Sequence, residues 1–401
     1  MTNFARFWAA QAISCLGSQI TVLAIPLLAL NMLGATPWEL GLLNALQFAP
    51  LLLFTLVAGV LVDWWQAKTV LVVTNALAGV LLLSLPVLWF YGLLSFWFLC
   101  LVGFLLGTVR VGIDIAVHTY PPQILGPAAL VTANSRLGMT YAAAEVAGPG
   151  LAGLVLQLIR PAVALLLDSV SYLAAAFLIG KTVAVQPQPA RRSHIRVADV
   201  IDGFAVTFRD PYLRTMVVLS SWFNLWGSAI MTCLMVYAVR DLQLDARALG
   251  LCLGIGGVGG LLGASVATRA GKSLGVGNTL RLSVVITLAG WFLLPSGAGA
   301  VFLSAGLAVQ MFGDGLYNVY AMSMRQILAP PDRLGRVNSC YRLLSHGSIP
   351  LGALAAGALM DLLGARQALY AFAVAAAGAL LFLGSRALAF RDIESLAPVR
   401  T

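Results

Sequence analysis

Three carboxyl side chains lie far inside apolar stretches of the sequence, at Asp114, Glu145 and Asp314. Burial disfavours the charged form of a carboxyl, which suits a group that takes up and releases a proton. A charge inside a bilayer is also costly unless it is paired or faces water. We therefore predict that at least one of these side chains binds a proton when the protein works.

Arginines near two of these carboxyls leave a second interpretation open. Arg110 and Asp114 are four residues apart, so on a helix they share a face and can pair. Glu145 can pair with Arg110 or with Arg136. These residues are then either ion pairs that neutralise themselves or parts of a water-facing site that binds a proton or a substrate charge.

Other polar side chains recur at helical spacing in the apolar stretches. The resulting candidates for a cavity that binds a substrate are Gln11, Ser14 and Ser18; Ser221, Asn224, Ser228 and Thr232, with Trp222 and Trp226 on a neighbouring stripe; Tyr317 and Asn318 beside Asp314; and Arg342 with His346. Hydrogen bonds between helices would explain any single stripe, whereas several stripes together favour a water-filled cavity. For Asp168, which precedes Ser169 and Ser171, we expect a structural role.

The composition indicates the environment of these residues. Hydrophobic residues make up 60% of the 401 residues and charged residues 10%, against about 25% charged in a soluble domain. So few charges exclude a soluble enzyme, a nucleic-acid-binding protein and a disordered chain. The five cysteines have no paired spacing, and neither an HExxH motif nor a complete GxxxxGK[ST] phosphate loop occurs. We expect no metal, no cofactor and no enzymatic activity.

Apolar runs of about 20 residues, the length that crosses a bilayer as a helix, indicate the fold. They lie at 7–33, 38–62, 69–91, 94–119, 131–158, 161–183, 212–238, 247–268, 278–296, 300–324, 337–360 and 364–389. The sequence therefore predicts an all-α integral membrane protein, in contact with membrane lipid, with twelve transmembrane helices. A polar stretch at 186–211 divides it into two six-helix bundles, at 1–185 and 212–401.

The distribution of basic residues predicts an orientation. With the N-terminus inside, the inner loops and termini hold 18 of the 24 lysines and arginines and the outer loops hold 4. Inner loops of membrane proteins are enriched in these residues. Both termini and the central loop are therefore expected in the cytoplasm, and the basic net charge of +9 needs no nucleic-acid partner.

An internal repeat relates the two halves. At an offset of 204 residues, the matches are Asn134-Ser135 with Asn338-Ser339, Gly148 with Gly352, Gly153 with Gly357, and Gly59 with Gly263. Repeated halves of a membrane protein indicate a transporter whose substrate binds where the halves meet.

The chain resembles the major facilitator superfamily of transporters over nearly its whole length. Gly59 and Asp63 match its motif between spans 2 and 3, although Gln66-Ala67 replaces the usual Gly-Arg pair and leaves Lys68 as the nearby cation. Gly148-Pro149-Gly150 with Gly153 is similar to the span-5 motif of exporters and antiporters. Residues 164–180 and 335–369 look like the branch that includes enterobactin exporters and macrolide-efflux proteins.

This resemblance implies a function and a set of roles. Spans 1, 4, 7 and 10 would line a central cavity, and Arg110 would match an arginine common in span 4, although Asp114 replaces the glycine that usually follows it. The implied protein is a bacterial inner-membrane monomer that exports an antibiotic, drug or siderophore by alternating access and proton antiport. Proton-coupled uptake of a small metabolite and a non-transporting scaffold are the alternatives.

Overall fold

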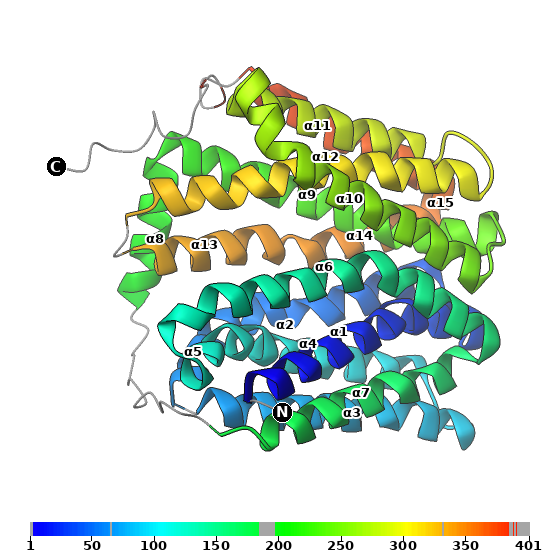
Figure 1. The fold of residues 1–401 in the computed structure, drawn as a ribbon. Coiled ribbons are helices and arrows are strands. Elements are labelled where there is room, and N and C mark those ends of the chain that lie inside the picture. The colour runs from blue at the N-terminus through cyan, green and yellow to red at the C-terminus, as the bar shows by residue number, and fades with distance from the viewer. Residues whose placement is uncertain are drawn as a thin grey trace. The chain divides into compact units, whose positions relative to one another are not determined.

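In the computed structural model, the described residues are 3–64, 66–183, 197–330, 333–384, 388 and 390, and the side chains at 55–64, 127–128 and 197–200 lie outside the description. This part of the chain folds into helices and contains no strand (Figure 1). Within it, eleven helices are long and apolar enough to cross a membrane.

The spanning helices match the expected apolar runs. They are α1 with η1 (Asn3–Met32), α3 (Ala67–Phe90), α4 (Phe96–Thr119), α6 (Pro127–Leu158), α7 (Pro161–Gly180), α9 with η2 (Pro211–Asp241), α10 (Ala246–Leu274), α11 (Val276–Leu293), α12 (Ala300–Leu328), α13 with α14 (Leu334–Leu363) and α15 with η3 (Ala365–Phe382). The 28-residue helix α2 (Pro37–Trp64) occupies the position of the second span. The expected all-α membrane fold is confirmed.

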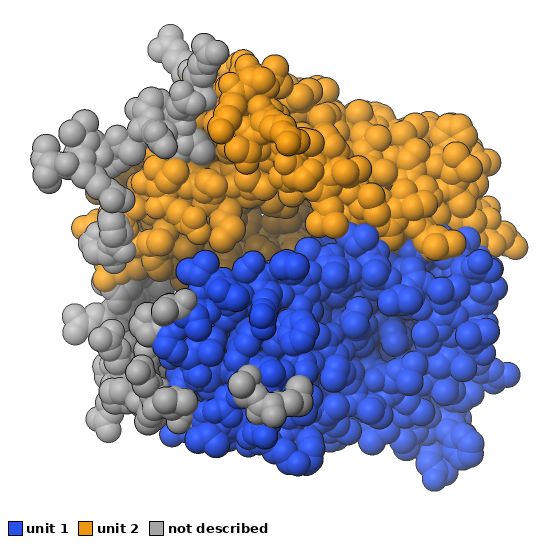
Figure 2. Space-filling model, viewed as in Figure 1, with its two compact units in different colours: residues 1–195, 245–250 blue, residues 196–244, 251–401 orange. Residues whose placement is uncertain are grey.

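Two compact units divide the chain (Figure 2). Unit 1 comprises residues 1–195 and 245–250, and unit 2 comprises residues 196–244 and 251–401. The polar stretch expected as a central loop contains a 13-residue helix, α8 (Val197–Arg209), which the sequence analysis did not predict. This helix belongs to unit 2.

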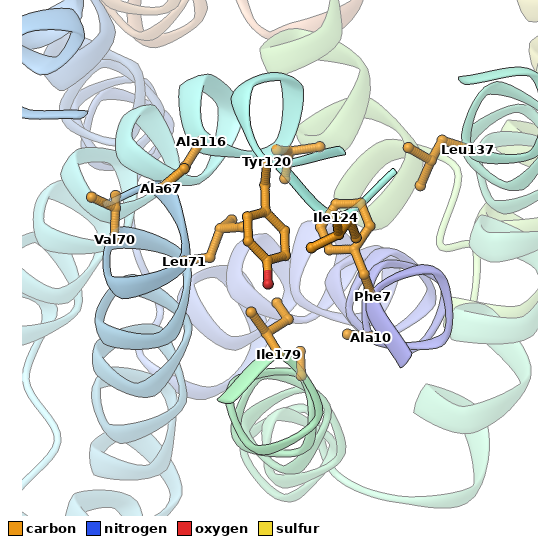
Figure 3. Close-up of a cluster of buried hydrophobic side chains, with 12 residues drawn as sticks. Phe7, Ala10, Ala67, Val70, Leu71, Ala116, Tyr120, Ile124, Leu137 and Ile179 are labelled. Atoms are coloured by element: carbon orange, nitrogen blue, oxygen red, sulfur yellow. The ribbon is translucent and has the colours of Figure 1, made fainter. Parts of the chain in front are cut away.

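In unit 1, α1 packs against α6 and α7, α3 against α4 and α7, and α2 against α4. A cluster of buried side chains fills one end of the unit (Figure 3). At its centre lies Tyr120, which joins α4 to the short helix α5 (Pro121–Ile124). The Tyr120 ring meets Phe7 of α1 edge-on, with ring centroids 5.4 Å apart, and its hydroxyl hydrogen-bonds Thr182 after α7. One residue thus ties together the ends of three spans.

In unit 2, α9 packs against α14 and α15, α11 against α12, and α8 against α13. The eleventh span is broken at one residue, Ser348, which separates α13 (Leu334–Gly347) from α14 (Ile349–Leu363). Pro350 has no amide hydrogen to donate to the preceding turn, which explains the break. Beyond it, Gly352 lies so close to α9 that a Cβ there would overlap the carbonyl oxygen of Leu225.

The internal repeat is also visible in the local backbone. The first span of each half ends in a five-residue π-helix, η1 (Leu28–Met32) and η2 (Tyr237–Asp241). Each π-helix is followed at the same distance by a residue with positive φ, Gly34 at 65° and Gln243 at 53°. Two helical halves that share such an irregular turn are repeats of one architecture.

Candidate functional site

The charged residues of spans 4 and 5 stand apart from one another in unit 1. Arg110 and Glu145 are exposed, and Asp114 is half-buried. Within the described part of the chain, the recorded ion pairs are those of Asp202, so neither Asp114 nor Glu145 forms an ion pair with Arg110 or Arg136. The self-neutralised pairs, one of the two interpretations left open by the sequence, do not form among the described residues. This geometry favours the other interpretation, in which these groups are accessible to a proton or a ligand.

Asp168 on α7 has a different environment. It is fully buried, and its carboxylate accepts hydrogen bonds from Thr21 of α1 and, at 2.8 Å, from Ser171. Gly17 of α1 packs so tightly here that a Cβ would overlap the Ser171 hydroxyl. Asp168 therefore links α1 to α7, which agrees with the structural role expected for it.

The polar stripe of α1 is used for contacts within unit 1. Gln11 is 5% exposed and accepts a hydrogen bond of 3.3 Å from the Tyr141 hydroxyl on α6. Ser18 donates to the Ser14 carbonyl and lies 2.9 Å from the Tyr172 hydroxyl on α7. For these two candidates, hydrogen bonds between helices explain the polar side chains.

Asp314 on α12 is held by neutral donors. Thr287 of α11 donates to Oδ1 at 3.1 Å, and Gln310 donates to Oδ2 through its amide nitrogen. In the described chain no cation forms an ion pair with it. A hydroxyl donates or accepts, and a side-chain amide offers either role when it flips. These two partners can therefore satisfy Asp314 both with and without a proton.

The repeat register gives Asp314 a counterpart of opposite charge. At the offset of 204 residues, Asp314 in the fourth span of the second half matches Arg110 in the fourth span of the first half. The halves thus share a backbone plan but differ in charge at one matched position. A symmetric backbone with asymmetric charge can assign different partners, such as a proton and a substrate, to its two halves.

The expected stripe of Asp314, Tyr317 and Asn318 does not share one environment. Tyr317 turns toward α9, where its hydroxyl lies 2.8 Å from the Ser220 hydroxyl and 3.1 Å from the Met216 carbonyl. Asn318, in contrast, is exposed. The three residues follow helical spacing but meet different neighbours, because α11 and α9 both contact α12.

The Tyr317 contact belongs to a larger network that sequence reasoning missed. The Ser220 hydroxyl also hydrogen-bonds the Tyr341 hydroxyl on α13. The guanidinium of Arg325 lies over the Tyr341 ring, 3.6 Å from its centroid. A cation over an aromatic face is stabilised by the ring quadrupole. Ser220 and Tyr341 are 121 positions apart, so no local pattern signals their contact.

The polar stripe of α9 bonds the broken eleventh span. Ser228 donates to the Ile349 carbonyl and Ser348 donates to the Ser221 carbonyl, both at 2.9 Å. Both bonds fasten the break between α13 and α14 to α9. Inside a membrane, backbone carbonyls such as these must find hydrogen-bond partners within the protein. Ser228 thus holds one helix to another through its side chain, whereas Ser221 contributes its backbone carbonyl and its own hydroxyl donates to the Val217 carbonyl.

Trp226 is the α9 candidate with an unsatisfied polar atom. Its ring packs against Trp222 and Phe372, with centroids 5.6 and 5.8 Å away. The indole nitrogen is buried without a hydrogen-bond partner. Together the three rings form an aromatic cluster in unit 2, in which Phe372 is buried and the two tryptophans are half-buried.

Three of the remaining second-half candidates are part-buried, whereas Thr232 is 2% exposed. These three are Asn224, Arg342 and His346. His346 Nδ1 lies 3.0 Å from the Ser345 hydroxyl, which supports a packing role for the imidazole. Arg342 is in no recorded ion pair of the described chain.

The span-5 glycines have distinct contacts. α6 runs unbroken through Pro149. A Cβ at Gly148 would overlap Gln19 of α1, and one at Gly153 would lie 2.5 Å from the Ala246 carbonyl oxygen, which also belongs to unit 1. A Cβ at Gly150 would meet nothing within 4 Å. Gly148 and Gly153 are therefore close-packing positions, and Gly150 is not.

The motif between spans 2 and 3 is described in part. Gly59 and Asp63 lie in α2, but their side chains fall outside the described residues. Lys68 is described and donates to the Thr182 carbonyl at 2.7 Å. Asn3 and Arg6, which sequence reasoning did not select, donate to the carbonyls of Val183 and Lys181. These three side chains bond the carbonyls of Lys181, Thr182 and Val183, the segment that directly follows α7.

Metal ligands do not gather in the residues that the structure describes, where no group of three or more His, Cys, Asp or Glu side chains is placed to hold an ion.

Sequence comparisons point to one family. A model described as transmembrane secretion effector matches residues 1–399. An uncharacterized MFS-type transporter of Sinorhizobium fredii, y4rN, is 24% identical over 363 residues, which cover 88% of this chain and 87% of that protein. The multidrug efflux pump Tap of Mycolicibacterium fortuitum is 24% identical over 369 residues, 87% of each chain.

Comparison with solved structures agrees on the fold. The crystal structure of the nucleoside transporter NupG matches with a TM-score of 0.75 over 96% of this chain and 98% of that one. Its sequence identity is 12%, so this likeness concerns the fold alone.

Proposed function

Because the chain belongs to the transmembrane secretion effector family of major facilitator transporters, we propose that it exports small amphipathic molecules across the bacterial inner membrane in exchange for protons. The chain is a multi-pass membrane protein that carries a small-molecule substrate. Direction, coupling ion and substrate class are the parts that we propose. We also propose that both termini are cytoplasmic and that the monomer is the working unit.

One observation carries the proton coupling. Arg110, Asp114 and Glu145 sit in spanning helices, exposed or half-buried, with no ion pair recorded among the described residues. Charges inside a bilayer are costly unless they are paired or face a water-filled cavity, so unpaired charges in spanning helices mark the path of an ion or a substrate. Asp314 adds a carboxyl whose two partners can satisfy either protonation state.

The energy source follows from these groups. A proton that binds to a carboxyl from outside and leaves to the inside moves with the membrane potential, which contributes about 2.3 kcal/mol per charge at 100 mV. Antiport requires that proton and substrate exclude each other, so that each half of the alternating-access cycle carries one of them. Asp114, Glu145 and Asp314 are the proposed proton carriers, and Arg110 is the proposed partner of a substrate charge.

The substrate class rests on two supports. The relative Tap is named as a multidrug efflux pump. The half-buried rings of Trp222 and Trp226 offer stacking partners for a planar apolar group. Antibiotics and dyes fit this description, and a catecholate siderophore is the third class to test.

Accumulation in cells tests this proposal. A host that lacks its own pumps would express either this chain or the double variant Asp114→Asn/Glu145→Gln, and take up a panel of dyes, macrolides, tetracyclines and catecholate siderophores. We expect the chain to lower the accumulation of at least one compound severalfold. A protonophore should restore accumulation, and the double variant should fail to lower it at normal membrane levels.

The control is Asp361→Asn, because Asp361 is an exposed carboxyl near the end of α14. This variant should export like the unchanged chain. Raised accumulation of one compound would show uptake instead of export. If the double variant exports as well as the unchanged chain, Asp114 and Glu145 do not carry the coupled proton.

A further inference from the structure

Helix α8 (Val197–Arg209) carries an apolar line that unit 2 does not cover. Ile201 and Phe208, seven residues apart and therefore on one side of the helix, are 62% and 41% exposed. Phe204 lies between them, and its ring stacks on Phe208 with planes only 4° apart. The three side chains form a continuous apolar edge about 10 Å long at 1.5 Å of rise per residue.

The opposite side of α8 is fastened to α13. Asp202 accepts hydrogen bonds from the Arg333 and Arg336 guanidiniums, at 3.0 and 2.7 Å. Gly203 lies against the Arg336 backbone, where a Cβ would be 2.6 Å from the carbonyl oxygen. Thr207, on the same side, is 1% exposed. These contacts set the rotation of the helix, so the apolar edge points away from unit 2.

The place of α8 in the chain puts it at a membrane boundary. Asp210 alone separates it from α9, a spanning helix, and caps the first turn of α9 through its carboxylate. Figure 1 shows α8 lying across the end of α13, crosswise to the spanning helices of its unit. A helix that crosses the ends of spanning helices lies along the plane of the bilayer.

Charge completes the pattern of a membrane-surface helix. Arg209 follows Phe208 directly and is exposed, and Arg214 in the first turn of α9 is also exposed. Helices that lie in the bilayer interface bury an apolar side among the lipid chains and hold basic residues at the headgroups. Basic residues close to a spanning helix attract anionic headgroups.

We propose that α8 is a membrane-surface helix whose Ile201, Phe204 and Phe208 side chains insert into the lipid interface, with Arg209 and Arg214 at anionic headgroups. The occupant of the apolar edge is the bilayer itself. Through Asp202, this helix holds the N-terminal end of the broken eleventh span at the membrane surface. The proposal requires only a membrane-spanning chain and stands apart from the substrate and from proton coupling.

Spin labels test this placement in the full chain. Single cysteines at Ile201, Phe208 and Arg209 would carry a nitroxide in protein reconstituted into nanodiscs of phosphatidylcholine and phosphatidylglycerol. Four of the five native cysteines are buried, and the half-buried Cys15 would be replaced by serine. Collision rates with oxygen, which concentrates in lipid, and with a water-soluble nickel chelate would be compared for each label.

Arg209→Cys is the matched control, because it lies one residue from Phe208 but off the apolar edge. We expect labels at 201 and 208 to collide severalfold more with oxygen, relative to nickel, than the label at 209. Equal, nickel-dominated ratios at all three positions would place the edge in water and overturn the proposal. If a labelled variant aggregates, a small fluorophore at Ile201→Cys replaces the nitroxide. Its quenching by brominated lipid then shows whether position 201 lies in lipid or in water.

Discussion

Asp314→Asn should abolish proton-driven transport while leaving unit 2 folded. Asparagine has the shape of aspartate and can keep the Thr287 bond, so the packing of α12 on α11 survives. It cannot take up a proton, so the cycle loses the step that the gradient drives. We expect uphill accumulation in proteoliposomes to fall more than tenfold, whereas exchange of substrate for substrate, which needs no net proton movement, continues.

Two further measurements make this result decisive. Asp314→Glu keeps an ionisable carboxyl and should retain part of the proton-driven transport. Thermal unfolding in detergent should change little for Asp314→Asn, which separates lost coupling from lost structure. Uphill transport by Asp314→Asn at the unchanged rate would mean that Asp314 only packs α12 on α11.

Gly352→Ala should be among the most damaging of the small substitutions in unit 2. A Cβ at Gly352 would overlap the Leu225 carbonyl oxygen of α9 and approach the Ala229 nitrogen to 3.2 Å. Both are backbone atoms, so no side chain can turn aside. Overpacking of this kind costs about 1–3 kcal/mol, and the midpoint of thermal unfolding in detergent should fall by several degrees.

Gly335→Ala is the matched control in the same span. A Cβ there would meet nothing within 4 Å, and alanine favours the helix over glycine. The midpoint should therefore stay or rise slightly. A Gly352→Ala protein as stable as Gly335→Ala would show that α9 and α14 do not approach each other as closely as the structure has them.

The helices were predictable because a membrane span needs only an apolar run of sufficient length. The run at 212–238, for example, becomes α9 with η2, Pro211–Asp241. Helix α8 was not predictable in this way. It has 13 residues, too few to cross a bilayer, and Asp199, Asp202 and Arg209 interrupt its apolar side chains, so no continuous apolar run marks it.

The candidate site was predictable as a set of residues but not as a set of partners. Helical spacing places Asp314 and Tyr317 near each other on α12, yet one bonds Thr287 and the other Ser220. Which helix approaches each side of α12 is set by tertiary packing. Spacing alone cannot tell a polar group that binds a neighbouring helix from one that faces a cavity.

The basic residues also show that sequence spacing identifies a candidate residue but not its partner. Four-residue spacing allowed Arg110 and Asp114 to pair, but long side chains have many rotamers, and the pair does not form. Lys68 was selected for its position in a motif, whereas its observed contact is the Thr182 carbonyl, 114 residues away. The match of Arg110 to Asp314 needed only the repeat register and was visible in the sequence.

Proton movement that accompanies transport tests the central claim most directly. Purified chain would be reconstituted into proteoliposomes with a pH-sensitive dye inside, and a compound identified by the accumulation panel would be added against an imposed pH gradient. We predict that the compound dissipates the gradient in the unchanged chain and not in Asp314→Asn. Transport of the compound with no proton movement in the unchanged chain would contradict proton antiport.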